Sequence, residues 1–142
     1  MDLRSQIVSV IKGDVQDDAE TLKKFSRDTS IFERKPALVV SPKDADDVSA
    51  LVRFASEAKK KGENISLTAR AAGTDMSGGP LTDSVVVSFT KYMNAMGDIG
   101  ADYAVAEPGI YYRDFEAETL AENGSILPPY PASREMCALG GM

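Results

Sequence analysis

Residues 68–79, with the sequence TARAAGTDMSGG, have the clearest capacity for binding chemistry in this chain. Most of their side chains are small, so the main chain can approach a ligand closely. Successive amide N–H groups in a tight turn form a concave site that suits an anion such as a diphosphate. The guanidinium of Arg70 and the hydroxyls of Thr74 and Ser77 would add further hydrogen bonds. We call residues 71–79 the first glycine loop.

This loop matches neither of the two best-known phosphate-binding patterns. A P-loop needs Gly-Lys-Ser/Thr at the start of a helix, and the dinucleotide fingerprint GxGxxG also opens a helix. Here no lysine is present and the loop leads into a strand. By spacing alone, a glycine-rich connection without a ligand is the simpler interpretation.

A second cluster of small residues changes that balance. Residues 131–141, PASREMCALGG, supply Pro131, Ser133, Gly140 and Gly141, where a main chain can again approach a ligand. Taken alone, the cluster reads equally well as a turn near a chain end. Two such segments in one small domain favour a binding site.

Composition excludes several classes of function. The 142 residues suffice for one domain with a core, and the net charge of −6 argues against binding nucleic acid. Because the chain has no histidine, Ser-His catalysis and histidine-ligated metal sites are excluded. No spacing typical of a calcium-binding loop is present, and the single cysteine excludes an internal disulfide. The sequence contains neither a membrane-spanning run nor a signal peptide, so we expect a cytoplasmic protein, with peripheral membrane association left open.

Hydrophobic periodicity and capping residues predict an alternation of helices and strands. We expect helices over residues 3–13, 19–25, 41–62 and 112–124, and strands over 37–40, 65–69, 84–90 and 102–109. The third helix would be capped by Ser41 or Asp44, with acidic residues in its first turn and lysines in its last. In the third strand, Val85 and Val87 alternate with Val86. The succession from 37 to 69 is a βαβ unit, which normally pairs its strands in parallel. The residues expected on buried helix faces are Leu3, Ile7, Val10, Ile11, Val48, Leu51, Val52, Ala55, Phe115, Thr119 and Leu120.

Six segments in order resemble a known family. They are PALVVSPKDADDVSALVRFA, TARAAGTDMSGG, VVVSFTKYMN, AEPGIYYRDFEAETLAENG, LPPYPAS and CALGGM. Their succession, from about residue 27 onward, resembles the N-terminal FAD-binding (PCMH-type) domain of the p-cresol methylhydroxylase and vanillyl-alcohol oxidase superfamily. Within it, the sequence is most similar to the FAD-linked D-lactate dehydrogenase and glycolate oxidase subunit group.

The resemblance implies an α+β fold with a βαβ first subdomain and the start of a second, mainly antiparallel subdomain. It implies a helical lead-in over 1–26, a first subdomain over 27–90 that carries the pyrophosphate loop, and a second over 91–142. The substrate or cap domain of the family is absent from these residues. The sequence therefore looks like a fragment, which we expect to be inactive and to bind FAD weakly.

The resemblance also implies which residues hold a noncovalent FAD. The first loop would wrap the pyrophosphate with its amides, and the second cluster would line the flavin side. A carboxylate at Asp75 would repel a diphosphate unless it points away and caps a nearby amide. The implied cofactor-binding residues are Arg70, Ala71, Ala72, Gly73, Thr74, Asp75, Met76, Ser77, Gly78, Gly79, Pro131, Ser133, Gly140 and Gly141.

The function implied is that of a flavin-dependent oxidoreductase that oxidises a 2-hydroxy acid by hydride transfer to the flavin. No catalytic or metal-binding residue is identified within these residues, so substrate-orienting groups and any electron-acceptor or membrane partner are expected to use other regions. The alternative is a noncatalytic α+β module whose glycine loop binds a small anion or a partner protein.

Overall fold

Aspartate side chains begin three of the helices in the computed structural model, which describes residues 2–142. These helices are α1 (Leu3–Val8), α2 (Ala19–Phe25) and α3 (Ala45–Lys60). In each, the carboxylate before the first turn accepts a hydrogen bond from an amide of that turn, as Asp44 does from Asp47 N at 3.0 Å. Such caps satisfy amides that the helix itself cannot, and α3 carries the acidic start and basic end that its sequence predicted.

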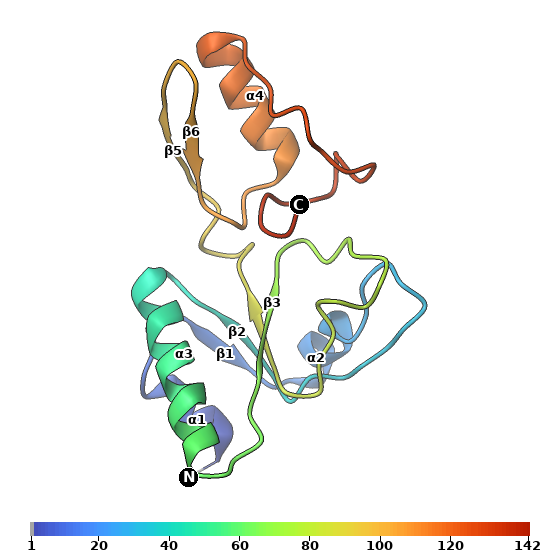
Figure 1. Cartoon of the computed structure of the whole chain (residues 1–142). Helices are drawn as coiled ribbons and strands as arrows, with labels where there is room; N and C mark the ends of the chain where they lie inside the picture. The colour runs from blue at the N-terminus through green and yellow to red at the C-terminus, as the bar shows by residue number, and fades with distance from the viewer. Residues whose placement is uncertain (1) are drawn as a thin grey trace.

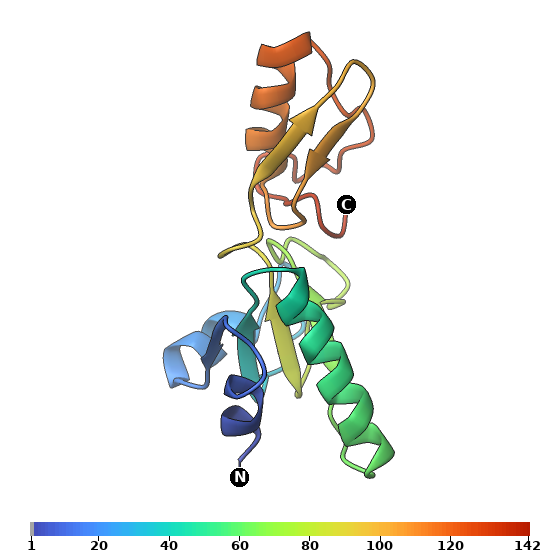
Figure 2. The same cartoon turned by 90° about the vertical axis from the view of Figure 1, so that its left-hand side faces the viewer.

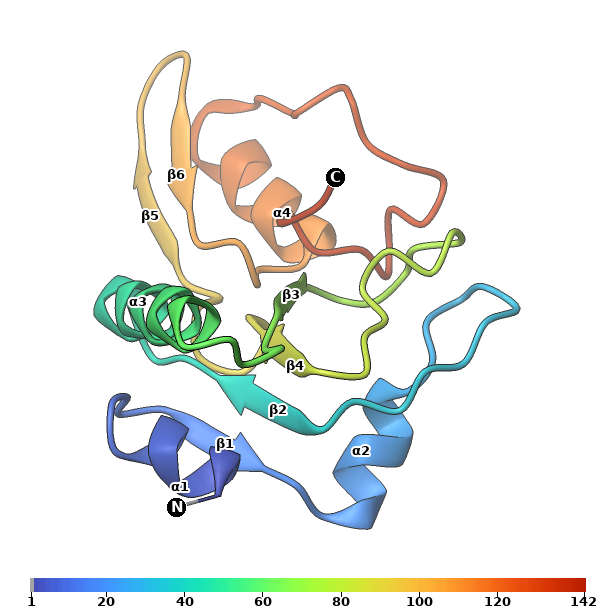
Figure 3. The same ribbon diagram turned by 60° about the horizontal axis from the view of Figure 1, so that its bottom comes forward.

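The first lobe is built on a four-stranded sheet (Figure 3). Its strands are β1 (Asp14–Gln16), β2 (Leu38–Ser41), β3 (Leu67–Arg70) and β4 (Val85–Ser88), in the order β1-β2-β4-β3. The β2-α3-β3 unit was expected to pair its own two strands, and that expectation is wrong. The last strand, β4, lies between them and pairs in parallel with both, while β1 pairs with β2 in the antiparallel sense.

Helices cover both faces of this sheet, and the strand residues alternate between them as the sequence predicted. Val85 and Val87 pack in one cluster with residues of α1 and α3, whereas Val86 packs on the opposite face with Leu22 of α2. Figure 2 shows α3 lying alongside the sheet. All four residues of β4 are buried, because it is a central strand with helices on both sides.

The second lobe combines a β-hairpin with one helix (Figure 1). The strands β5 (Met96–Ile99) and β6 (Ala104–Ala106) are antiparallel, and α4 (Tyr112–Asn123) packs beside them. An antiparallel second sheet confirms the expected fold class. Phe115 and Thr119 are buried as predicted, but Leu120 is 47% exposed, as is Val52 of α3 at 57%. The two exposed residues lie at the edges of their predicted apolar faces.

The first helix is shorter than predicted, because the chain turns toward β1 after Val8. Ile7 is fully buried, whereas Val10 lies beyond the helix and is 42% exposed. The Gly13 backbone lies so close to β2 that a Cβ on it would collide with the carbonyl oxygen of Ser41. This close approach places the 12–13 segment against the start of α3.

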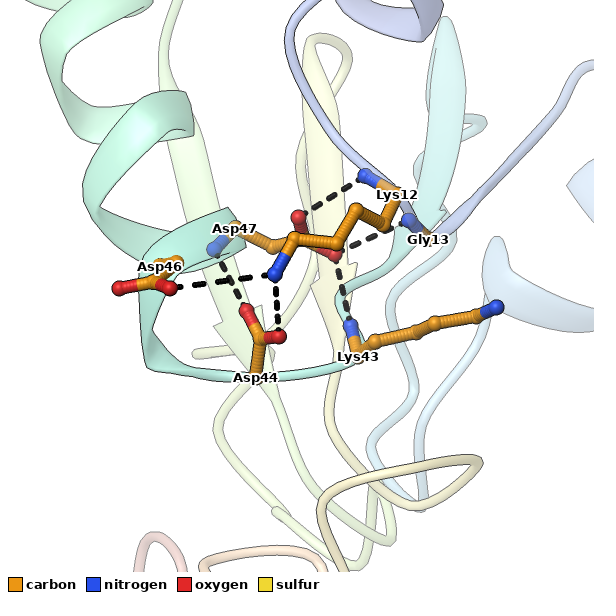
Figure 4. Close-up of polar contacts among 6 residues, drawn as sticks. All are labelled: Lys12, Gly13, Lys43, Asp44, Asp46 and Asp47. Atoms are coloured by element: carbon orange, nitrogen blue, oxygen red, sulfur yellow. Dashed lines mark hydrogen bonds and ion pairs between the residues drawn. The ribbon is translucent and has the colours of Figure 1, made fainter.

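The Asp47 carboxylate ties that segment to the helix (Figure 4). It is 1% exposed and accepts hydrogen bonds from the amides of Lys12, Gly13 and Lys43, each at 2.9 Å. A buried carboxylate costs little free energy when several donors satisfy it. Asp47 therefore ties the 12–13 segment to the start of α3, more than thirty residues away along the chain.

Candidate functional site

A cleft of about 500 Å³ lies between the two lobes. Its walls come from the first glycine loop on one side and from residues 131–142 on the other, and Phe89 and Pro108 close it where the lobes join. Figure 1 shows the C-terminal segment facing the chain that follows β3. The volume falls in the range of small-molecule sites. All the residues that the sequence predicted for the site line this cleft except Met76, Ser77 and Gly78.

The first glycine loop is a crossover connection and not a hairpin, because β3 and β4 are parallel. The chain leaves the C-terminal end of β3 and must return to the opposite end of the sheet before β4 begins. Only its first part, residues 71–75, together with Gly79 and Pro80, reaches the cleft. Met76 is 82% exposed at the outer tip. This explains why Met76, Ser77 and Gly78 fall outside the cleft.

The amides of Ala71 through Asp75 donate to no acceptor within residues 2–142. The carbonyl oxygens at the end of this run do have partners, because those of Thr74 and Asp75 accept hydrogen bonds from Thr29. In a trans peptide the N–H points away from the C=O, so the amide of Asp75 is directed away from Thr29. A consecutive set of unpaired amides beside a cleft is the arrangement that binds anions.

Gly73 shows why this part of the loop needs a residue without a side chain. Its φ of 74° lies in the left-handed region, and a Cβ would collide with the guanidinium of Arg70. The loop therefore folds back over the Arg70 side chain.

Asp75 caps the loop, as the sequence analysis required of a carboxylate at this position, and the residue also lines the cleft. Its Oδ1 accepts hydrogen bonds from the Ser77 amide at 2.6 Å, the Ser77 hydroxyl at 2.7 Å and the Gly79 amide at 3.2 Å. These bonds lower the pKa of the Asp75 carboxyl below its ordinary value, with the Ser77 hydroxyl as the largest cause. The Ser77 hydroxyl is thus committed to Asp75 and not to the cleft.

Arg70 is buried, and its guanidinium points toward the neighbouring chain segment. Nη2 donates to the carbonyl of Arg27 at 2.8 Å and Nη1 to that of Phe25 at 3.3 Å, and the group lies 5.1 Å from the centre of the Phe25 ring. Burial lowers the pKa of this guanidinium, which nonetheless remains protonated, while the Asp28 carboxylate acts in the opposite direction. Direct contact of Arg70 with an anion stays a prediction.

The second wall of the cleft is held by main-chain bonds to the segment before α4. Gly140 N donates to Pro108 O at 2.7 Å and Leu139 N to Ile110 O at 3.0 Å, while Tyr112 N donates to Cys137 O at 3.0 Å. Cys137 is 3% exposed, so it packs as a small apolar residue beside the cleft. Sequence reasoning missed Phe89 as a lining residue; its signal was its place at the end of the apolar strand pattern.

The arrangement is suited to binding and not to proton transfer. Among the described residues that line the cleft, only Arg70 and Asp75 have charged side chains, and both are already engaged by the protein. Unpaired amides next to apolar side chains such as Phe89 and Pro108 fit a ligand with a diphosphate and a flat apolar part. The residues present therefore fit a dinucleotide cofactor.

Curated relatives match from about three quarters to nearly all of this chain. The D-2-hydroxyglutarate dehydrogenase of Pseudomonas putida is 29% identical over 94% of this chain, which covers 13% of that protein. The glycolate oxidase subunit GlcD of Bacillus subtilis is 26% identical over 99% of this chain and is covered to 30%. The D-lactate dehydrogenase of Archaeoglobus fulgidus is 29% identical over 74% of this chain and is covered to 23%. The chain thus spans less than a third of the length of these relatives.

Solved structures show the same fold. The 4-ethylphenol oxidase of Gulosibacter chungangensis superposes with a TM-score of 0.73 and 27% identity, over 94% of this chain and 26% of its own. A p-cresol methylhydroxylase superposes with a TM-score of 0.70 and 19% identity, over 87% of this chain and 25% of its own. Both agree with the resemblance expected from the sequence. The model of the FAD binding domain family matches residues 36–142, well over half of the chain, and the chain therefore belongs to the FAD binding domain family.

Proposed function

We propose that this chain is the FAD-binding part of a flavin-dependent oxidoreductase that oxidises a 2-hydroxy acid. The relatives named above, a D-2-hydroxyglutarate dehydrogenase, a glycolate oxidase subunit and a D-lactate dehydrogenase, share that substrate chemistry in their names. Because this chain spans only part of each, the reaction belongs to the full product of the gene.

One observation carries the proposal more than any other. Five consecutive amides, from Ala71 to Asp75, lack acceptors within residues 2–142 and lie in the wall of the cleft. Hydrogen bonds to an anionic diphosphate would satisfy them without added positive side chains. This matters in a chain with a net charge of −6, whose overall field repels anions.

The second wall would then contact the ring system of the cofactor. Pro131, Ser133, Gly140 and Gly141 line it, and none has a side chain large enough to block a flat ring. When bound, the flavin supplies the redox chemistry, and these residues supply orientation. We propose noncovalent attachment, because the only cysteine is buried in packing and the chain has no histidine.

Residues 27–90 and 91–142 would form two subdomains that share this cofactor, and β1 (Asp14–Gln16) of the preceding segment adds an edge strand to the sheet of the first. Within residues 2–142 no helix has both the length and the apolar character needed to cross a bilayer. A cytoplasmic location and an electron-acceptor partner are parts of the proposal that cell fractionation and acceptor assays would test.

The test uses the full product of the reading frame that encodes these residues. We expect the purified protein to be yellow, to release its flavin on acid denaturation, and to bleach anaerobically with D-2-hydroxyglutarate, D-lactate or glycolate. A colourless protein that gains no flavin absorbance on incubation with FAD would instead support the noncatalytic anion-binding or partner-binding module.

A charge placed in the loop tests the diphosphate contact itself. Ala72→Asp puts a carboxylate in the cleft wall and should weaken FAD binding on the order of tenfold or more through repulsion. The matched variant Ala72→Asn has the same shape without the charge and should retain most of the affinity. Equal affinities for the two variants would place the diphosphate elsewhere.

A further inference from the structure

The loop formed by residues 26–34 touches the first glycine loop from outside the cleft. Its base is closed by main-chain pairing of Arg27 with Glu33 and by a 2.8 Å bond from Arg34 N to Ser26 O. Because its base is closed, this loop has few alternative conformations. It therefore loses little conformational entropy when it contacts the first glycine loop. We call residues 26–34 the supporting loop.

Thr29 makes the contacts between the two loops. Its hydroxyl lies 2.9 Å from the carbonyl oxygen of Thr74 and 2.8 Å from that of Asp75, so its single proton is shared between them. Its amide donates to the Asp75 carbonyl at 3.2 Å. Two successive carbonyls of the first glycine loop are therefore held on the side away from the cleft.

This contact bears on the amides because each carbonyl is rigidly linked to the next N–H. The peptide joining Thr74 to Asp75 is planar and trans, so fixing its oxygen on Thr29 fixes the Asp75 amide in the opposite direction. The other end of the run is fixed as well, since the Arg70 guanidinium is bonded to the carbonyls of Phe25 and Arg27. The run from 71 to 75 is thus anchored at both ends to the same stretch of chain.

We propose that Thr29 is a positioning residue for the cofactor, which holds the amides of the first glycine loop in the orientation that binds the FAD diphosphate. This inference rests on the proposed function and extends it to a residue that does not line the cleft. Thr29 acts through the loop and is exposed to solvent, so it contributes to binding more than to folding.

The experiment compares FAD dissociation constants of the apoprotein form of the full gene product. Thr29→Val keeps the branched Cβ and removes the hydroxyl donor, and we expect its dissociation constant to rise about five- to tenfold. Thr29→Ser restores the donor and should bind within about twofold of the parent. The thermal midpoints of the three apoproteins should agree, and the phosphorus NMR signals of bound FAD should shift only in the Val variant.

Ser30→Ala is the matched control, because its hydroxyl bonds only within the supporting loop, to Asp28 and Phe32. It should leave the dissociation constant unchanged. The proposal is overturned if Thr29→Val binds FAD as tightly as the parent, if Thr29→Ser is no better than Val, or if Ser30→Ala is equally weakened. If valine prevents folding, Thr29→Ala removes the same donor without bulk and carries the same expectation. Failure of the parent itself to bind FAD would refute the proposed function instead.

Discussion

Two aspartates in this protein each accept several main-chain hydrogen bonds, yet they lie in very different settings. Asp47, at the start of α3, is 1% exposed, and two of its three partners, Lys12 and Gly13, are more than thirty residues away in the sequence. Asp75, in the first glycine loop, is exposed, and its partners Ser77 and Gly79 lie within four residues.

The difference indicates what each carboxylate contributes. The Asp47 carboxylate is buried and its three bonds are partly buried, so removal of this group leaves three partly shielded amides without their acceptor. Water can replace Asp75, so removal of that group mainly frees the loop to adopt other shapes. We therefore expect substitutions at Asp47 to affect stability, and substitutions at Asp75 to affect cofactor binding.

The largest expected effect is on stability at Asp47. Asp47→Ala should lower the free energy of unfolding by about 3 kcal/mol, because three amides lose a charged acceptor. The measurement is chemical denaturation followed by circular dichroism. Asp46→Ala is the control, since that side chain is 91% exposed in the same helical turn and should change stability by no more than about 0.5 kcal/mol. Equal losses of stability at both positions would mean that Asp47 stabilises the protein through its charge near the helix N-terminus and not through its buried hydrogen bonds.

Gly13→Ala tests the same contact between the 12–13 segment and the start of α3, by adding a methyl group instead of removing a charge. The added methyl group would collide with the Ser41 carbonyl, so we expect a loss of about 2 kcal/mol as β1 and β2 move apart. Denaturant titration gives the value. A neutral result would show that the 12–13 segment has room to shift without breaking the Asp47 bonds.

At Asp75 we expect FAD affinity to change while stability does not. Asp75→Ala removes the acceptor for Ser77 and Gly79 and should weaken FAD binding about three- to tenfold, with the thermal midpoint unchanged. Asp75→Asn keeps an acceptor oxygen and removes the charge, so it should bind FAD at least as tightly as the parent. Tighter binding by both variants would show that the charge of Asp75 matters more than its cap.

The smallest expected effect concerns pH. The pKa of Asp75 is lowered by its hydrogen bonds, so the contribution of its ionised form is complete above the ordinary carboxyl pKa and is lost only as pH falls through the lower folded value. The ratio of FAD affinities of the parent and Asp75→Asn should therefore stay constant between about pH 8 and pH 5. A ratio that changes in this range would mean that the pKa is raised instead.

Much of the fold could be predicted because it depends on local patterns. The cap at Asp44, the basic last turn of α3 and the alternation of Val85, Val86 and Val87 are all visible within a few residues of sequence. The short strands β1 and β5 were missed, because three or four residues with mixed polarity have no periodicity to detect. The position of β4 was missed for another reason: strand order depends on contacts across the whole chain.

The residues that line the candidate site were predicted better than the residues that hold them in place. The small residues that line the cleft can be recognised in the sequence because few other roles require so many of them together. Thr29 could not be found in the same way, since a threonine in a polar loop has no distinguishing pattern and its contact with Thr74 spans 45 residues. Sequence identifies surfaces more readily than the contacts that fix their shape.

The position of β4 has a consequence for how the chain reaches its folded state. In the order β1-β2-β4-β3, the inner strand β4 is also the last of the four to be synthesised, so β2 and β3 have no partner between them until residue 88 has left the ribosome. The glycine-rich crossover is the link that delivers β4, so pairing of β4 between β2 and β3 also fixes where both ends of that crossover lie. The first wall of the cleft and the core of the first lobe thus depend on the same stretch of chain, whereas the second wall, residues 131–142, can be added only later in synthesis.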